Sequence, residues 1–207
     1  MAKRDLYSKA FEHLYAIAEA QQGYFTARQA AEAGFDARNH PYHVRAGNWI
    51  RERRAIYRLA RFPPAERPDL VLWSLWSRGR KGEVRGTFSH ETALSIFELS
   101  DAMPAKLHMT VPAGFRRMAP IPKGLVLHQG SLSKEDMEIR QGYRVTRPLR
   151  TLADLVVEGR VSPDLLRQAV QEALDRGLVR LSAIRQAAHL PPSVRESLEK
   201  LIKEPSR

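Results

Sequence analysis

The side chains best suited to chemistry in this sequence are basic, amide and aromatic groups between residues 26 and 58. Asn, Arg and His side chains hydrogen-bond to base edges, and Arg side chains also hold phosphate groups. A polar helix followed by a basic hairpin therefore predicts a nucleic-acid interface, with a solvated basic face for protein contacts as the alternative. The candidate DNA-binding residues are Thr26, Arg28, Arg38, Asn39, His40, Tyr42, His43, Arg45, Arg51, Arg53, Arg54 and Arg58.

Within this set, the helix and the hairpin have different expected roles. The predicted base-reading residues are Asn39, His40, Tyr42 and His43. The arginines of the helix and the hairpin are expected to hold phosphates. Trp49 and Tyr57 are expected to pack within the hairpin rather than to stack on bases.

A search for metal ligands and acid–base pairs finds little in the sequence. His40 and His43 have the spacing of one helix face, but no nearby carboxylate completes a metal site with them. His90 beside Glu91 is expected to mark the start of a helix rather than an acid–base couple. The chain has no Cys, which excludes disulfides, thiolate zinc sites and a Cys nucleophile. We predict no metal site and no cofactor.

The motifs of common enzyme classes are also absent. None of the eight lysines follows an acidic residue by two positions, as a metal-dependent nuclease triplet would require. The chain has no P-loop, no G-x-S-x-G elbow and no G-x-G-x-x-G fingerprint. We therefore predict that the protein is not an enzyme. A metal-dependent nuclease is the enzymatic alternative, and it would reveal itself by magnesium-stimulated cleavage.

The charge balance favours a polyanionic partner. The 207 residues include 34 Lys and Arg against 23 Asp and Glu, a formal net charge of +11. Lys and Arg displace the counterions that condense on phosphate backbones. The first 62 residues are the most basic part per residue, with 11 basic and 6 acidic side chains. Double-stranded DNA is the expected partner, although charge alone also fits RNA or an acidic membrane.

The composition predicts a folded protein that does not enter a membrane. Hydrophobic residues make up 43% of the chain, enough for at least one sizeable core. No stretch approaches the roughly 18 consecutive apolar residues of a membrane span, and the N-terminus is amphipathic rather than signal-like. The expected location is the cytoplasm.

The candidate DNA-binding residues fall within one small predicted domain. The expected elements are helices over residues 6–20, 27–33 and 36–46 and a hairpin over 49–59. Thr26 is a suitable cap for the second helix, Asp36 or Asn39 for the third, and Gly47 ends it. Three helices and a hairpin make a winged helix-turn-helix, which we place at residues 1–62, before the paired prolines Pro63 and Pro64.

A second predicted unit, residues 63–207, mixes helices and strands, which gives the whole chain an α+β class. The expected elements are helices near 70–76, 90–98 and 147–155, strands at 107–111, 125–128 and 143–145, a helix over 165–176 and two short helices within 182–204. Ser89 and Thr146 are predicted to cap the helices that follow them. Arg150 and Asp154, one helical turn apart, are predicted to pair.

Taken in order, a series of short motifs resembles a known family. The motifs are Gly23-Tyr24-Phe25-Thr26, Gln29-Ala30 with Gly34, Val44-Arg45-Ala46-Gly47, Ile56-Tyr57-Arg58-Leu59, Ser89-His90-Glu91-Thr92-Ala93-Leu94, Leu99-Ser100-Asp101 with Pro104, Leu107-His108-Met109-Thr110-Val111-Pro112, Val145-Thr146 and Arg150-Thr151-Leu152-Ala153-Asp154-Leu155. Together they resemble the AbiEi family, the antitoxins of type IV toxin–antitoxin systems. The resemblance covers about residues 10 to 160. Family hairpins usually place Gly before the apolar-Tyr pair, where this chain has Ala55.

The resemblance implies a bacterial transcriptional autorepressor and antitoxin. In such proteins the N-terminal winged helix binds inverted repeats in the promoter of its own operon, and the larger C-terminal domain carries the antitoxin activity. The implied functional partner is a nucleotidyltransferase-like toxin, counteracted without a stable complex, in systems linked to abortive infection of phage. The alternative is an orphan winged-helix regulator, or an RNA- or protein-interaction module without antitoxin activity.

The resemblance also carries over to five residues of the second unit. The possible antitoxin-domain residues are Ser89, His90, Glu91, Arg150 and Asp154. Their alternative role is capping and ion pairing within the domain.

Overall fold

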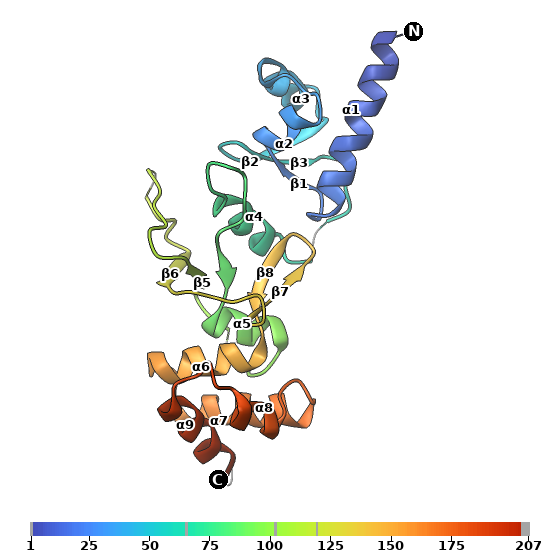
Figure 1. Ribbon diagram of the computed structural model, residues 1–207. Helices are drawn as coiled ribbons and strands as arrows, with labels where there is room; N and C mark the ends of the chain where they lie inside the picture. The colour runs from blue at the N-terminus through green and yellow to red at the C-terminus, as the bar shows by residue number, and fades with distance from the viewer. Residues whose placement is uncertain (1, 65, 102, 119, 204–207) are drawn as a thin grey trace. The chain divides into compact units, whose positions relative to one another are not determined.

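Contacts along the chain divide it into two compact units, in a computed structural model that describes residues 2–64, 66–101, 103–118 and 120–203 (Figure 1). One unit holds Met1–Arg85 and Ile139–Tyr143, and the other holds Gly86–Glu138 and Arg144–Arg207. Helices and two sheets give the predicted α+β class. Within the described residues, no helix combines the length and the apolar character needed to cross a bilayer.

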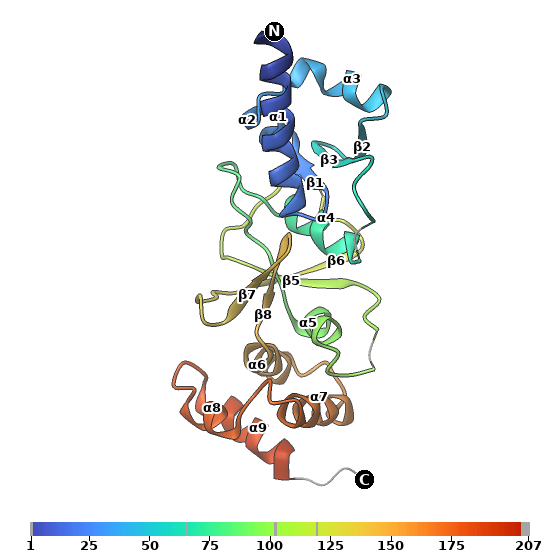
Figure 2. The same ribbon diagram turned by 90° about the vertical axis from the view of Figure 1, so that its right-hand side faces the viewer.

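The first unit has the element order of a winged helix-turn-helix followed by one more helix. Its elements are α1 (Ala2–Glu19), β1 (Tyr24–Thr26), α2 (Ala27–Glu32), the 3-10 turn η1 (Ala37–Asn39), α3 (His40–Arg45), β2 (Trp49–Arg53), β3 (Ile56–Leu59) and α4 (Pro68–Trp76). The three strands form an antiparallel sheet in the order β1-β3-β2. Figure 2 shows α2 and α3 beside α1, with the strands next to them.

The helix boundaries follow from local capping. Thr26 Oγ1 accepts a hydrogen bond from the Gln29 backbone N–H, and Gln29 Oε1 accepts one from the Thr26 backbone N–H, so a capping box starts α2. Asp36 caps η1 by accepting from the Arg38 amide. Asn39 stands at the cap position of α3 without a side-chain bond, so of the two predicted caps Asp36 makes the contact. Because each cap involves neighbours in the chain, these starts were accessible to sequence reasoning.

The core of the first unit is an apolar cluster between α1, α2 and the sheet. Leu14 and Ala18 of α1 are fully buried, and the Phe25 and Trp49 rings meet edge to face at 4.9 Å. The second half of α1 therefore carries the side chains that this helix buries. Leu6 is 68% exposed because the first turns of α1 reach past the sheet.

The hairpin of β2 and β3, which we call the wing, has a turn that departs from regular geometry. Ala55 adopts a φ of +60°, a left-handed conformation that a Cβ disfavours. A bulge between Arg51 and Arg53 shifts the register just before this turn. The position at which the AbiEi pattern has Gly is thus the one that needs positive φ here.

Helix α4 packs against β1 and β3, so it belongs to the same compact unit as the winged helix. Its residues Leu70 and Val71 are fully buried. The segment Ile139–Tyr143 joins this unit as well, and a Cβ on Gly142 would lie 3.1 Å from a Val71 methyl group. The compact unit therefore extends beyond residue 62. The domain boundary that we expect after residue 62 stays a prediction.

Among the described residues, the second unit combines a mixed sheet with five helices. Its elements are β4 (Thr87–Phe88), α5 (His90–Phe97), β5 (Leu107–Val111), β6 (Leu125–Gln129), β7 (Met137–Arg140), β8 (Tyr143–Thr146), α6 (Pro148–Glu158), α7 (Pro163–Asp175), α8 (Leu181–Gln186) and α9 (Pro192–Lys203). The end of β7, the turn after it and the first residue of β8 belong to the first unit. The strand order is β6-β5-β4-β8-β7. β4 pairs antiparallel with β5 and parallel with β8, and β5 pairs parallel with β6. β4 was not predicted, because its two residues leave no alternation to detect. β7 was not predicted either, although it has the same length as β8.

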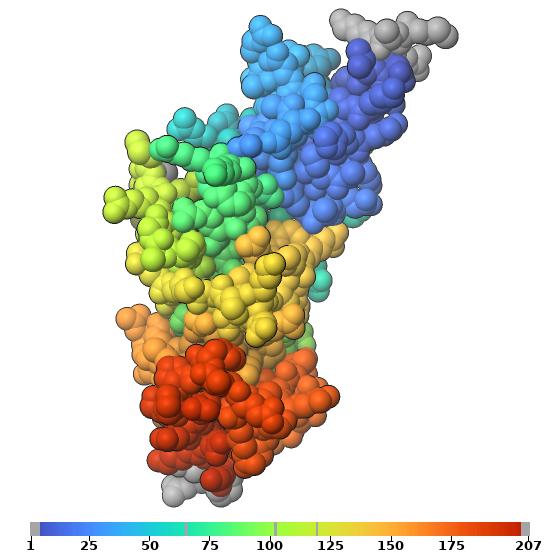
Figure 3. Space-filling model, in the orientation of Figure 1, coloured from blue at the N-terminus to red at the C-terminus, as the bar shows by residue number. Residues whose placement is uncertain are grey.

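The C-terminal helices pack on one another and through α6 on α5. Ala169 and Ala173 of α7 and Leu198 of α9 are fully buried. In the space-filling view their atoms, orange to red, form one continuous body (Figure 3). The Ser162 side chain accepts from the Leu165 amide and caps α7, which begins at Pro163, two residues before the start of the predicted range 165–176.

Candidate functional site

Six of the twelve candidate DNA-binding residues have exposed polar side chains on η1, α3 and the wing. They are Arg38, Asn39, Tyr42, Arg45, Arg51 and Arg54. The first four lie on η1 and α3, and the last two lie on or next to β2. We call this set the helix–wing surface. It has the side-chain types that contact bases and phosphates, on the two elements that a winged helix presents to DNA.

Arg38 is held in place by the acid that caps its own turn. Its guanidinium contacts the Asp36 carboxylate at 2.7 Å, while 89% of the Arg38 side chain stays exposed. The hydrogen bonds from Arg38 lower the pKa of Asp36 to about 2. The ion pair with Asp36 therefore orients the Arg38 guanidinium, while the rest of the group stays exposed to solvent.

Four other candidates have intramolecular partners that account for them. Thr26 belongs to the capping box of α2. Arg28 pairs with Glu32 at 2.7 Å and also donates to the Arg80 carbonyl. Arg58 pairs with Glu52 at 2.9 Å. Arg53, although exposed, lies over the Trp73 ring at 4.3 Å and thereby links the wing to α4.

The two candidate histidines of α3 are buried, which corrects their predicted role. His40 is 3% and His43 is 5% exposed. The His43 ring stacks on Trp49 at 4.5 Å, and His40 Nε2 lies 3.1 Å from the Phe35 carbonyl oxygen. Because a six-residue helix has to cover an aromatic core, these rings pack inward. Neither is placed to read bases.

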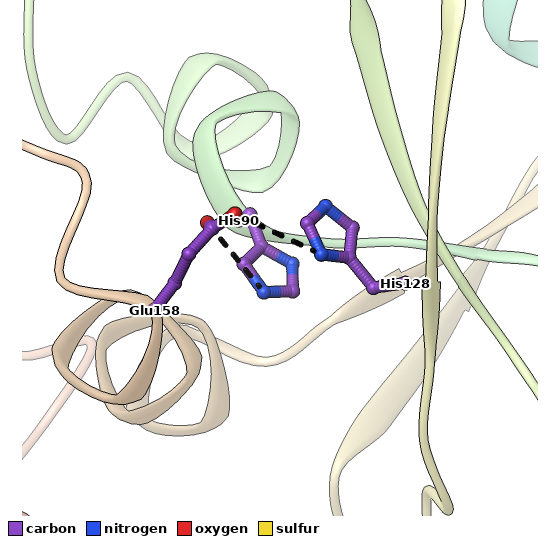
Figure 4. Close-up of side chains that lie close together, drawn as sticks. All are labelled: His90, His128 and Glu158. Carbon is purple, nitrogen blue, oxygen red and sulfur yellow. Dashed lines mark ion pairs between the residues drawn. The ribbon is translucent and has the colours of Figure 1, made fainter.

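The second unit contains a cluster of histidines and carboxylates that sequence reasoning did not assemble. His90 begins α5, His128 lies on β6 and Glu158 ends α6 (Figure 4). The His90 and His128 rings stack at 3.7 Å, and His90 Nε2 and His128 Nδ1 each lie 3.9 Å from a carboxylate oxygen of Glu158. We call these three side chains the His–His–Glu cluster.

A second histidine–carboxylate pair adjoins this cluster. His108 on β5 places Nδ1 3.0 Å from His128 Nε2 and 3.0 Å from a carboxylate oxygen of Glu91. Since β5 and β6 are parallel neighbours with His128 opposite Thr110, the strand pairing brings His108 next to His128. The polar contacts run without a break from Glu91 to Glu158.

The cap predicted at Ser89 does not form, and the reason lies in this cluster. The Ser89 side chain accepts no capping hydrogen bond from the backbone of α5. Its Oγ instead lies 2.9 Å from His90 Nδ1 and accepts a 2.8 Å bond from Thr110. His90 itself has a φ of +53°, a strained conformation for the first residue of a helix. Thr146 likewise makes a 2.7 Å bond to Thr151 rather than capping α6.

A pocket of about 640 Å³ opens beside the cluster. The residues that line it include His90, His128, Arg150, Asp154, Glu158 and Arg160. The predicted Arg150–Asp154 pair is present at 2.7 Å, and Arg150 also contacts Asp136 at 3.2 Å. Of the five possible antitoxin-domain residues, His90, Arg150 and Asp154 line the pocket. Ser89 contacts His90 of the cluster, and Glu91 contacts the neighbouring His108.

Burial is the largest cause of the pKa shifts of His90, His128 and Asp154. Desolvation, assisted by the neighbouring His128, lowers the pKa of His90 to about 3, and desolvation also lowers the pKa of His128. Burial raises the pKa of Asp154 despite its pairing with Arg150. For Glu91, burial acts in the same upward direction, but the hydrogen bond with His108 and its other contacts bring the pKa below its ordinary value. The imidazoles of His90 and His128 are therefore neutral near neutral pH.

Comparison with known proteins informs the fold alone. No family model matches the chain, and no curated protein matches it. A crystal structure of the RV2827C protein from Mycobacterium tuberculosis superposes with a TM-score of 0.53 at 15% identity, over 96% of this chain and 76% of that one. The similarity supports the arrangement of helices and strands described above.

Proposed function

We propose that this protein is a sequence-specific DNA-binding regulator that represses its own promoter and serves as the antitoxin of a type IV toxin–antitoxin system. The observation that carries the DNA-binding part is the helix–wing surface, which gathers exposed Arg, Asn and Tyr side chains on a winged-helix fold. The antitoxin part rests on the resemblance to the AbiEi family. The proposal places the protein in the bacterial cytoplasm.

On DNA, the short helix α3 would enter the major groove while the wing follows the backbone. Asn39, Tyr42 and Arg45 supply donors and acceptors that suit base edges. Arg51 and Arg54 supply charges that suit phosphates. Because α3 has only six residues, few bases can be read by one copy, which suits an operator made of repeated half-sites.

The antitoxin part of the proposal concerns the second unit. There, three of the five residues carried over from the AbiEi pattern, His90, Arg150 and Asp154, line one pocket, and the other two contact His90 and His108. Such a gathering fits a shared role better than independent caps, since Ser89 does not cap its helix. The proposed functional partner is a nucleotidyltransferase-like toxin that is neutralised without a stable complex.

Fluorescence anisotropy tests the DNA-binding part. The full chain is titrated against the duplex upstream of its own gene and against a scrambled duplex of equal length, at several salt concentrations. A preference for the upstream duplex that persists at physiological salt supports a specific repressor. Equal, steeply salt-dependent binding to both duplexes would instead favour the interaction-module alternative.

Co-expression tests the antitoxin part. A nucleotidyltransferase-like toxin encoded beside this gene is expressed with and without the full chain, and cell growth is followed. Rescue by the chain, and continued rescue by a variant with Arg51 and Arg54 replaced by Ala, would assign neutralisation to the second unit. Lack of rescue by the wild-type chain would leave a solitary regulator.

A further inference from the structure

We propose that His90, His128 and Glu158 form a binding site for a divalent transition-metal ion, with Zn²⁺ the best match. One ligand atom from each of the three side chains lies within 4.8 Å of the other two. The three residues come from α5, β6 and α6, so the packed second unit holds them together (Figure 4). The inference is independent of DNA binding, which belongs to the other unit.

The donor set selects the class of ion. Two imidazole nitrogens and one carboxylate oxygen are a ligand set used by zinc sites that keep a position open for water or substrate. Mg²⁺ and Ca²⁺ prefer sites made of oxygen atoms, so they fit this set poorly. The adjacent pocket of about 640 Å³ provides access for the ion and room for a further ligand.

The spacing of the cluster is slightly wider than a closed site, as expected before binding. Two ligand atoms about 2.0–2.1 Å from a tetrahedral ion lie roughly 3.4 Å apart. Each imidazole nitrogen that faces Glu158 is 3.9 Å from a carboxylate oxygen, too long for a hydrogen bond. The two nitrogen–oxygen distances would have to shorten by about half an ångström around an ion. Because the His90 and His128 rings stack nearly parallel at 3.7 Å, one ring would also have to turn so that both nitrogens point to the same ion.

Glu158 has a free coordination position. Its Oε2 atom is buried and has no hydrogen-bond partner among the described residues. A buried carboxylate oxygen without a donor is costly, because water no longer solvates it. A cation between Glu158 and the two imidazoles would satisfy this oxygen.

The surroundings also orient the two imidazoles. His90 Nδ1 contacts Ser89 Oγ at 2.9 Å, and His128 Nε2 contacts His108 Nδ1 at 3.0 Å. These contacts leave His90 Nε2 and His128 Nδ1, the two nitrogens that face Glu158, for an ion. A polar partner on the second nitrogen is characteristic of metal-binding histidines. The strained φ of +53° at His90 is a further sign that the ring position is constrained.

The charged side chains that line the pocket are balanced, with the carboxylates of Asp154 and Glu158 and the guanidinium groups of Arg150 and Arg160. Two further carboxylates lie behind this lining, Glu91 against His108 and Asp136 against Arg150. Glu158 is the last residue of α6, where the helix dipole adds partial negative charge. The opposite dipole, at the start of α5, is met by Glu91 in its first turn.

Isothermal titration of the chelator-treated full chain with ZnCl₂ tests the site. We expect one tightly bound ion per chain, and a weakening of more than about 100-fold in His128→Gln and in Glu158→Gln. The neighbour variant His108→Gln, which removes only a partner of a ligand, is expected to weaken binding about 10- to 100-fold. The control is His13→Gln, an exposed histidine of α1, which should bind as the wild type does.

Two further measurements keep the test decisive if a variant misfolds. Co²⁺ bound to the wild-type chain should give the visible d–d absorption of a low-symmetry nitrogen–oxygen site, and Zn²⁺ should abolish it. MgCl₂ in excess should leave the Zn²⁺ isotherm unchanged. Equal binding by folded wild type and His128→Gln, or a Co²⁺ spectrum identical to that of the aqueous ion, would overturn the proposal.

Discussion

Ala55 has a left-handed backbone conformation that favours Gly over Ala. Its φ of +60° at the turn of the wing costs about 1–2 kcal/mol for a residue with a Cβ. We expect Ala55→Gly to raise the free energy of unfolding by about 0.5–1 kcal/mol, after allowing for the greater entropy of Gly in the unfolded chain. Urea denaturation followed by Trp fluorescence measures the change.

The matched control is Ala46→Gly, also exposed, at a residue with an ordinary φ of −75°. There, Gly relieves no strain and should lower stability slightly. If both substitutions destabilised the chain equally, the wing turn would not hold Ala55 in the left-handed conformation.

His43 should make the first unit less stable in acid. Burial, with a contribution from His40, lowers its pKa below the ordinary 6.5, and the other groups packed on its ring are aromatic. Between the folded and unfolded pKa values the unfolded chain binds more protons, so stability falls as pH drops through this window. In His43→Phe the loss in unfolding free energy from about pH 7 to about pH 5 should be smaller.

The same variant separates packing from base reading. Phe can stack on Trp49 but cannot hydrogen-bond to a base. His43→Phe should therefore keep the wild-type ranking of DNA duplexes in anisotropy titrations. A changed ranking would return His43 to the set of base contacts, and an unchanged pH dependence would contradict its burial.

At the scale of elements, the wing and α3 should contribute to DNA binding in different ways. Arg51→Ala and Arg54→Ala should each weaken binding to all duplexes and reduce the slope of log affinity against log salt by about 0.9. Asn39→Ala should instead alter the preference among duplexes. Anisotropy at several salt concentrations measures both effects.

The control for the wing variants is Arg185→Ala on α8, a largely exposed arginine of the second unit. It removes the same charge and should leave the salt slope near the wild-type value. A slope that fell equally in Arg185→Ala and Arg51→Ala would show that total charge, rather than the wing, governs binding.

At the scale of the whole molecule, α4 determines where the first unit ends. Leu70 and Val71 are buried, and Arg53 of the wing lies on Trp73. We expect a fragment of residues 1–85 to unfold cooperatively and at a higher temperature than a fragment of residues 1–62, because the shorter one exposes the surface that α4 covers. Thermal unfolding followed by circular dichroism compares them. Equal midpoints would support the predicted boundary after residue 62.

The sequence by itself determined the winged helix, because its signals come from near neighbours. The Thr26 capping box, the stop at Gly47 and the alternation of the hairpin each need only residues within a few positions. The same reasoning placed the Arg150–Asp154 pair, which spans one helical turn. Local rules also gave the α+β class, since helices and strands could be recognised one by one.

Only the tertiary structure decided which side chains meet. His90, His128 and Glu158 lie far apart in the sequence and come together because β5 pairs with β6 and α5 packs on α6. The same packing places the Ser89 hydroxyl beside the His90 ring, so Ser89 does not cap α5. In the first unit, the aromatic core takes up the rings of His40 and His43. Spacing along the chain carries no record of such contacts, because they depend on strand order and on the volume that neighbouring side chains leave free.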